Sequence, residues 1–331
     1  MTLSLFSLPS LVLAEIFDQM TAAEIVFISL SSKKSNKIIK ACRRKQENLS
    51  LTIQHDKNFA FSNGTETVKF LRVRPSWHNN QLTSKISIEN HKNVTCKLFK
   101  YGGLDTFWND TEQGTKSCIA HICDLLGIVV STFSFFSTND EMWIVDWVYQ
   151  RQGRLENFET DAPWKVSQEE YRKFLRCNAT EEISISAIAP KNFRFLEKLP
   201  VVKLLNVSSC EWITIDHLLT MEIRALETWS KSNLSNGDIN NFLKHWLAGG
   251  SPRLRYFSIQ IRNVMPEVLF QDFEDIVEFV ERPREFEWHP GCVQKFNRSF
   301  DIARNDGVTA SLVRFKNYDP EWSHVSIFVW P

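Results

Sequence analysis

The sequence predicts an α+β protein with a helical start, a β-rich middle and an α/β second half. Three observations predict this class. Residues 1–45 carry apolar side chains at helical spacing, and residues 49–101 hold short runs in which apolar and polar residues alternate. The second half alternates strand-like and helix-like segments. We therefore expect a helical segment at 1–45, a β-rich connector at 46–115, and an α/β repeat-like domain at 116–331 that ends in a β-hairpin.

The first helix is predicted from a stripe formed by Leu8, Val12, Leu13, Ile16, Phe17 and Met20. Pro9 suits the first turn, where a missing N–H costs nothing. Thr21 and Glu24 form a capping box that starts a second helix, and a third, basic helix runs from Lys33 to Arg44. Three short helices bury too little surface to be very stable alone, so the segment is expected to need a partner. The alternative is a helical hairpin that packs on the rest of the chain.

These residues carry a resemblance to a known family. The run Leu8-Pro9-x-x-Val12-Leu13-x-x-Ile16-Phe17-x-x-Met20, followed by Ile25, Leu30 and Ser32-Lys33-Lys34, resembles an F-box, although Ala22 and Ser35 depart from the usual proline and tryptophan. An F-box binds the Skp adaptor of cullin-type ubiquitin ligases. The resemblance therefore implies a Skp-binding surface made of Leu8, Pro9, Val12, Leu13, Ile16, Phe17, Met20 and Ile25.

The connector is predicted to be a small antiparallel meander. Its alternating runs are 49–53, 68–73, 86–88 and 94–98, separated by residues that favour turns. A buried helix is expected from Ser117 to Val130.

Strand-like segments recur in the second half, starting at Val130, Leu155, Thr180, Val202, Ile223 and Leu254. Val202-x-x-Leu205-x-Val207-x-x-Cys210 fits a leucine-rich-repeat pattern, and a helix is expected from Ser235 to Leu247. Parallel strands with helices on one side would leave the other sheet face open for a target protein. The side chains predicted on that face are Phe136, Asn157, Glu159, Ser184, Ser186, Asn206, Ser208, Glu227, Ser258 and Gln260. The alternatives are an irregular α/β domain, or a face covered by helices or by the closing hairpin.

The same region carries a second resemblance. Ser209-Cys210-Glu211-Trp212-Ile213-Thr214, Asn240-Asn241-Phe242-Leu243-Lys244-His245-Trp246-Leu247 and Gly249-Gly250-Ser251-Pro252-Arg253-Leu254 resemble the type 2 F-box-associated domain of nematodes. The tail from Asp301 to Trp330 is similar to the closing hairpin of that family. The two resemblances imply a substrate-recruiting adaptor of a cullin-type (SCF) ubiquitin ligase, whose F-box binds the Skp adaptor, and through it a cullin, while the second half binds a protein target. They do not identify that target or show that ubiquitination follows; a Skp-bound scaffold is the alternative.

The composition argues against several other classes of protein. Lys+Arg and Asp+Glu are 39 each, so no excess of positive charge favours nucleic acid, and no apolar run is long enough to span a membrane. Seven dispersed cysteines favour a reducing compartment, so we expect a cytoplasmic or nuclear protein. A secreted glycoprotein is the weaker alternative, suggested by eight Asn-x-Ser/Thr sites and an apolar start that lacks a preceding basic residue.

No catalytic motif stands out. The cluster Cys118, His121 and Cys123 lacks the second half that a zinc site needs, and His245 and Cys210 fit structural positions. We expect no enzyme activity, no cofactor and no metal.

Overall fold

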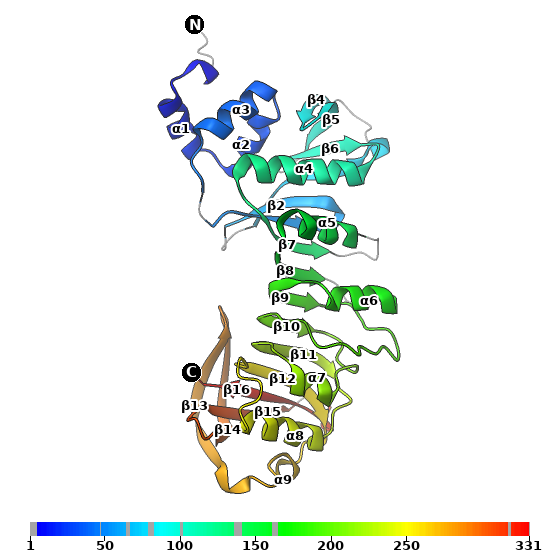
Figure 1. Cartoon of the computed structure of the whole chain (residues 1–331), viewed down its shortest axis with the longest axis vertical. Coiled ribbons are helices and arrows are strands. Elements are labelled where there is room, and N and C mark those ends of the chain that lie inside the picture. Colours follow the sequence, from blue (N-terminus) through cyan, green and yellow to red (C-terminus); the bar gives the residue numbers. More distant parts are fainter. Residues whose placement is uncertain are drawn as a thin grey trace. The chain divides into compact units, whose positions relative to one another are not determined.

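The structure is a computed structural model that describes residues 5–46, 48–63, 67–78, 83–99, 102–135, 141–160, 165–316 and 319–330. The chain packs into two compact units (Figure 1). The first unit contains residues 1–137 and 143–155, and the second contains residues 138–142 and 156–331. Helices cover a run of neighbouring strands in each unit.

The first unit opens with three helices, as the sequence predicts. After a 3₁₀ turn η1 (Leu5–Ser7), they are α1 (Ser10–Asp18), α2 (Ala22–Ser29) and α3 (Lys33–Cys42). The predicted capping box starts α2: the Thr21 hydroxyl accepts from the Glu24 amide at 3.3 Å, and the Glu24 carboxylate accepts from the Thr21 amide at 2.8 Å. These bonds satisfy amides that have no partner inside the helix, which fixes where α2 begins.

Strands fill the middle of the first unit. They are β1 (Ser50–Gln54), β2 (Asn58–Ser62), β3 (Thr67–Pro75), β4 (Ser84–Ile88), β5 (His91–Phe99), β6 (Gly103–Trp108) and β7 (Val130–Phe135), with 3₁₀ turns η2 (His55–Lys57) and η3 (Ser76–His78). Their spatial order is β7-β1-β2-β3-β6-β5-β4. The expected antiparallel meander holds only in part: β1, β2 and β3 pair antiparallel in sequence order and β4 pairs antiparallel with β5, but β6 pairs with β3 in parallel. Outside the predicted connector, β7 pairs with β1 in parallel. The hairpin of β4 and β5 lies between β3 and β6 in the chain and brings β6 back in the same direction.

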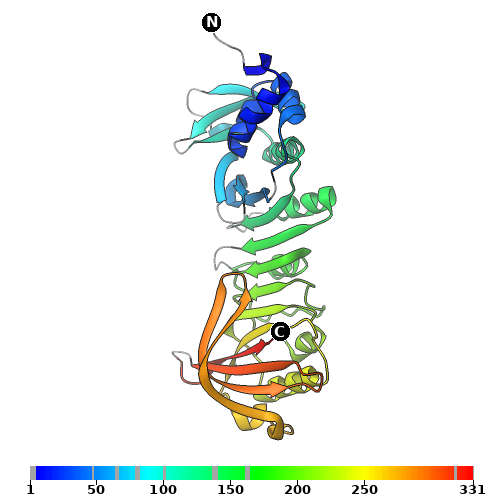
Figure 2. The same ribbon diagram turned by 90° about the vertical axis from the view of Figure 1, so that its left-hand side faces the viewer.

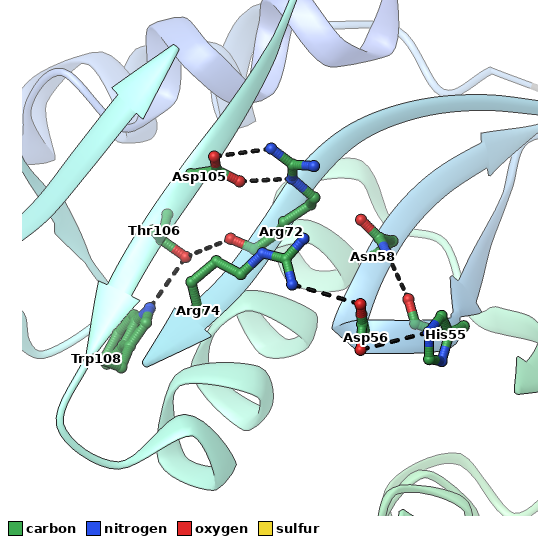
Figure 3. Close-up of polar contacts among 8 residues, drawn as sticks. All are labelled: His55, Asp56, Asn58, Arg72, Arg74, Asp105, Thr106 and Trp108. Atoms are coloured by element: carbon green, nitrogen blue, oxygen red, sulfur yellow. Dashed lines mark hydrogen bonds and ion pairs between the residues drawn. The ribbon is translucent and has the colours of Figure 1, made fainter. Parts of the chain in front are cut away.

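Polar side chains tie β3 to β6 and to the turn after β1 (Figure 3). Arg72 donates through Nε and Nη2 to the two carboxylate oxygens of Asp105, at 2.5 and 2.8 Å, and its guanidinium carbon lies 4.1 Å from the centre of the Phe99 ring. Arg74 reaches Asp56 at 3.5 Å. Each charge in this cluster has a partner in the chain, so the cluster joins strands rather than forming a site.

Helix α4 (Thr111–Leu126) packs against β3, β4 and β6 and contacts α2 and α3. Asp110 caps it by accepting from the amides of Glu112 and Gln113, and Gly127 ends it in the left-handed conformation. The helix begins six residues before the predicted start at Ser117, so the predicted boundary after residue 115 falls inside it. Helix α5 (Met142–Gln152) follows β7 along the chain. The division into three domains stays a prediction.

A buried histidine links α4 to the opening helices. His121 Nε2 lies 2.8 Å from the Ser29 hydroxyl of α2, and Nδ1 lies 3.3 Å from the Glu89 carboxylate after β4. Burial lowers the pKa of His121, and this effect exceeds the opposite effect of Glu89. The folded unit therefore prefers neutral His121.

We expect the free energy of unfolding of the first unit to fall as the pH drops below about 6.5, the ordinary pKa of histidine. Below about pH 6.5 the unfolded chain binds a proton at this ring more readily than the folded unit, because the pKa of His121 is lower in the folded unit. Protonation therefore favours unfolding, and the stability present at higher pH is lost. Urea unfolding of His121→Gln should show a weaker pH dependence than the wild type, whereas the exposed-site variant His78→Gln should keep it. Parallel pH profiles for wild type and His121→Gln would contradict the assignment.

The second unit begins with parallel strands joined by helices. The strands are β8 (Leu155–Thr160), β9 (Ala179–Ile185), β10 (Leu204–Val207), β11 (Ala225–Lys231) and β12 (Tyr256–Arg262), and the helices are α6 (Gln168–Leu175), α7 (Ile215–Thr220), α8 (Asn236–Leu247) and α9 (Pro266–Leu269). Strands β9 to β12 pair in parallel in sequence order. The strand starts predicted at Thr180, Val202, Ile223 and Leu254 each lie within two residues of the observed start of one of these strands. This agreement supports the mixed α/β prediction.

Helices cover one face of these strands. The Phe174 ring of α6 lies 5.7 Å from Phe158 of β8, and the Phe242 ring of α8 lies 5.2 Å from Phe257 of β12. Ser235 caps α8 as predicted, accepting from the Asp238 amide. Because strand side chains alternate between faces, the neighbours of these apolar residues in the sequence lie on the opposite face, which we call the open face.

The chain ends in four antiparallel strands rather than one hairpin. After a 3₁₀ turn η4 (Glu274–Ile276), they are β13 (Val277–His289), β14 (Cys292–Ala303), β15 (Thr309–Lys316) and β16 (Trp322–Val329), and β16 pairs with β12. Strand β14 pairs with β15 only from Phe300 to Ala303, so most of the β13–β14 hairpin extends beyond the sheet. Figure 2 shows this hairpin crossing the strands on the side away from the helices.

Candidate interaction surfaces

The stripe predicted to bind a partner divides into an exposed and a buried half. Pro9 and Val12 are exposed, with Val12 at 43%, and Leu8, Ile16 and Met20 are half-buried. These five side chains leave an apolar surface along α1. A surface of this kind commonly marks a protein interface.

The buried half belongs to the interior of the unit. The sequence predicts Leu13, Phe17 and Ile25 on the partner-binding surface, but all three are buried, and the Phe17 side chain is only 1% exposed. Helices α1 and α2 both pack on α3, and this packing takes up one side of the stripe. Leu11, which the sequence analysis did not select, is 77% exposed beside Val12 and enlarges the apolar surface.

The predicted target-binding residues that the structure describes lie where strand alternation puts them. Asn157 and Glu159 of β8 flank the buried Phe158. Ser186 and Ser208 come directly after β9 and β10. The register partners on the adjacent strands β9 to β12 are Ser184, Asn206, Glu227 and Ser258. Apart from Ser258, all of these residues are half-buried, and so is Gln260. Ser258 is only 4% exposed and cannot be reached by a target, because β16 lies beside it and Ser326 shares a hydrogen bond with it at 2.9 Å. Phe136 lies outside the described residues.

The β13–β14 hairpin covers part of the open face, whereas the alternatives drawn from the sequence were cover by helices or by the closing hairpin at residues 301–330. Phe286 and Phe296 of the hairpin pack in one buried cluster with Leu204, Tyr256 and Phe328 of the sheet. The rings of Phe296 and Phe328 stack at 4.9 Å, and those of Tyr256 and Trp288 stack at 4.5 Å. A partner could therefore reach only the part of this face beyond the hairpin.

Two carboxyl groups are half-buried near the hairpin tip. Burial, followed by the neighbouring Glu182, raises the pKa of Glu227 to about 7. Burial also raises the pKa of Glu182, while His289 lowers it. Among the described residues neither carboxyl group has an ion-pair partner.

An exposed tryptophan lies on the same face and was missed by the sequence analysis. Trp229 of β11 is 58% exposed, and its Nε1 donates to the Asn206 side chain at 2.8 Å. Trp229 follows Glu227 by two residues on β11, so strand alternation alone places both side chains on the open face. From the sequence, Glu227 was selected and the indole beside it was overlooked, although tryptophan is enriched among the residues that dominate interfaces.

The residues considered for metal or thiol chemistry have separate partners. His121 contacts Ser29 and Glu89, and burial raises the pKa of the Cys118 and Cys123 thiols to about 12. Burial also raises the pKa of the Cys210 thiol, which disfavours the reactive thiolate. All seven cysteines are free thiols. Among the described residues, no group of His, Cys, Asp and Glu is placed to hold a metal ion, and no helix is long and apolar enough to cross a membrane.

Comparison with known proteins gives matches at two places in the chain. The F-box domain family model matches residues 5–47, which contain α1 to α3, and the F-box associated family model matches residues 184–259, which extend from β9 into β12. No solved structure matches the chain.

Two curated relatives come from Caenorhabditis elegans. One, the F-box associated domain-containing protein sdz-33, is 24% identical over 172 residues, covering 45% of this chain and 53% of the relative. The other, Skn-1 dependent zygotic transcript 15 protein, is 25% identical over 195 residues, covering 55% of this chain and 54% of the relative. The chain spans about half the length of these relatives. Together with the two family models, they confirm the resemblance of this chain to nematode F-box proteins with an F-box-associated domain.

Proposed function

We propose that the protein is a substrate-recruiting adaptor of a cullin-type ubiquitin ligase, acting inside the cell. The observation that carries this proposal is the exposed apolar surface of α1, because it lies within the F-box match and has no cover in the described chain. Leu8, Pro9, Leu11, Val12, Ile16 and Met20 would bind the Skp-family adaptor. Other subunits would supply the cullin and the transfer of ubiquitin, so this chain would need no catalytic residue.

The second unit would select the target protein. The polar open face of β8 to β12, with a leucine-rich-repeat-like arrangement of strands, is the proposed target surface. Its half-buried Asn157, Glu159, Ser184, Asn206 and Glu227 suit a protein partner because hydrogen bonds and bridging waters are common in such interfaces. Part of this face is F-box-associated sequence, which supports giving it the role of recognition.

Replacing Val12 with aspartate should abolish co-purification of the Skp-family adaptor. Burying a valine or leucine side chain on binding is worth about 1.5–3 kcal/mol, and a buried unpaired carboxylate adds a further cost. Affinity for the purified adaptor, measured by calorimetry, should fall by at least about tenfold in Val12→Asp and further in Leu11→Asp/Val12→Asp. Both side chains are exposed, so the fold should survive.

Leu98→Asp is the matched control, since Leu98 is an exposed leucine on β5 of the same unit. It should bind the adaptor like the wild type. Unchanged adaptor binding by Leu11→Asp/Val12→Asp would refute the proposed surface. Recovery of the adaptor without cullin would favour the scaffold instead of the ligase.

A further inference from the structure

The open face holds a tryptophan whose ring is already fixed in position. Trp229 Nε1 donates to Asn206 Oδ1 of β10 at 2.8 Å, and its carbonyl accepts from Gln260 Nε2 of β12 at 3.0 Å. Asn206 of β10 therefore holds the indole ring and Gln260 of β12 holds the backbone of Trp229, while the side chain remains largely exposed. Such a side chain loses little conformational entropy when a partner binds, which is a property of residues that dominate interfaces.

Two half-buried carboxyl groups lie on the same face as this ring. Glu227 is the register partner of Asn206, the residue that holds Trp229, and Glu182 is the partner of Leu204 on the same face. These carboxyl groups face His289 and Cys292 of the hairpin and Tyr256 of β12, and Glu287 lies near Cys292. Three cations near the strand ends and on the hairpin are paired within the chain: Lys231 with Asp319, Arg262 with Glu321 and Arg284 with Asp301.

Given the proposed adaptor function, we propose that the open face binds a basic segment of the target, with an arginine or lysine lying against Trp229 and the carboxylates of Glu182 and Glu227. A cation is attracted to the face of an indole, and it also supplies the charge that the two half-buried carboxylates lack. Shape alone would allow an apolar or acidic segment. The charge of this face disfavours both.

Binding of a cation should be coupled to loss of a proton. Because the pKa of Glu227 is about 7 in the free protein, part of its population is protonated near neutral pH. The cation binds the ionised carboxylate, so affinity should rise as the pH increases from about 6 to about 8. His289 faces the same carboxyl groups, and burial lowers the pKa of His324 at the edge of the region, so the contribution of Glu227 must be isolated by substitution.

The test uses two fluorescent decapeptides of glycine and serine, one with two arginines and the other with two glutamines in their place. The purified full chain should bind the arginine peptide at least about tenfold more tightly by fluorescence polarisation. Trp229→Ala and Glu227→Gln should each reduce that affinity about tenfold, and Glu227→Gln should flatten its pH dependence. Trp77→Ala and Glu211→Gln, which change an exposed tryptophan of the first unit and an exposed acid, should leave the affinity unchanged.

Equal affinity for the two peptides, or arginine-peptide binding that Trp229→Ala and Glu227→Gln do not alter, would overturn the inference. Binding of the Skp-family adaptor is measured on the same proteins. If the adaptor binds but the arginine peptide does not, the basic target is wrong and the adaptor function stands. If the wild type binds the arginine peptide but not the adaptor, the adaptor function fails separately.

Discussion

Phe17→Ala is expected to lower the free energy of unfolding of the first unit by about 3–5 kcal/mol, because it removes a fully buried aromatic side chain and leaves a cavity. Phe17 is 1% exposed on the side of α1 that faces the interior. The proposed adaptor surface is on the other side of the same helix, so the variant should lose adaptor binding only as the helices unfold. Urea unfolding, with hydrogen exchange of the α1 to α3 amides, measures both effects.

Leu11→Ala is the control for Phe17→Ala, since Leu11 belongs to the same helix and is mostly exposed. Its free energy of unfolding should stay within about 0.5 kcal/mol of the wild type, while its affinity for the adaptor falls. Equal stability of Phe17→Ala and wild type would show that α1 is not packed as described. The pair of variants thus separates residues that hold the helix from residues that contact a partner.

The sequence predicts elements whose signals are local. The capping boxes of α2 and α8 each depend on residues three apart, Thr21 with Glu24 and Ser235 with Asp238, and both are present. Local sequence also predicts which side chains of each parallel strand lie on the open face, because side chains alternate between the two faces with a period of two. Ser184, Asn206 and Glu227 are therefore on the expected face.

Features that depend on distant packing could not be read in the same way. The stripe of α1 contains both Val12 and Phe17, and periodicity does not say which part of a stripe faces the chain and which faces a partner. Likewise, parallel pairing of β6 with β3 depends on where an inserted hairpin lies, a choice made by tertiary contacts. Trp229 was within reach of the sequence, because it follows Glu227 by two residues and alternation puts both on the same face.

The hairpin was the largest omission. Strand β13 is mostly charged or exposed, and only Phe286 is fully buried along it. Charges and Pro283 suit an outer strand, because they discourage pairing with another chain. A pattern with one buried residue in thirteen gives no local sign that the strand covers a sheet.

Phe286→Ala should release the hairpin from the open face. Phe286 lies 5.3 Å from the Phe328 ring and 5.1 Å from the Trp330 ring, and replacing a buried phenylalanine by alanine typically costs about 3–5 kcal/mol. The cost falls on the contact between hairpin and sheet, so amides of β13 and β14 should exchange faster than those of β10 and β11. Phe279→Ala is the control, because Phe279 lies on the same strand but is 53% exposed. If the two variants show the same exchange, Phe286 does not anchor the hairpin; if only Phe286→Ala speeds exchange, the cluster determines how much of the open face a target can reach.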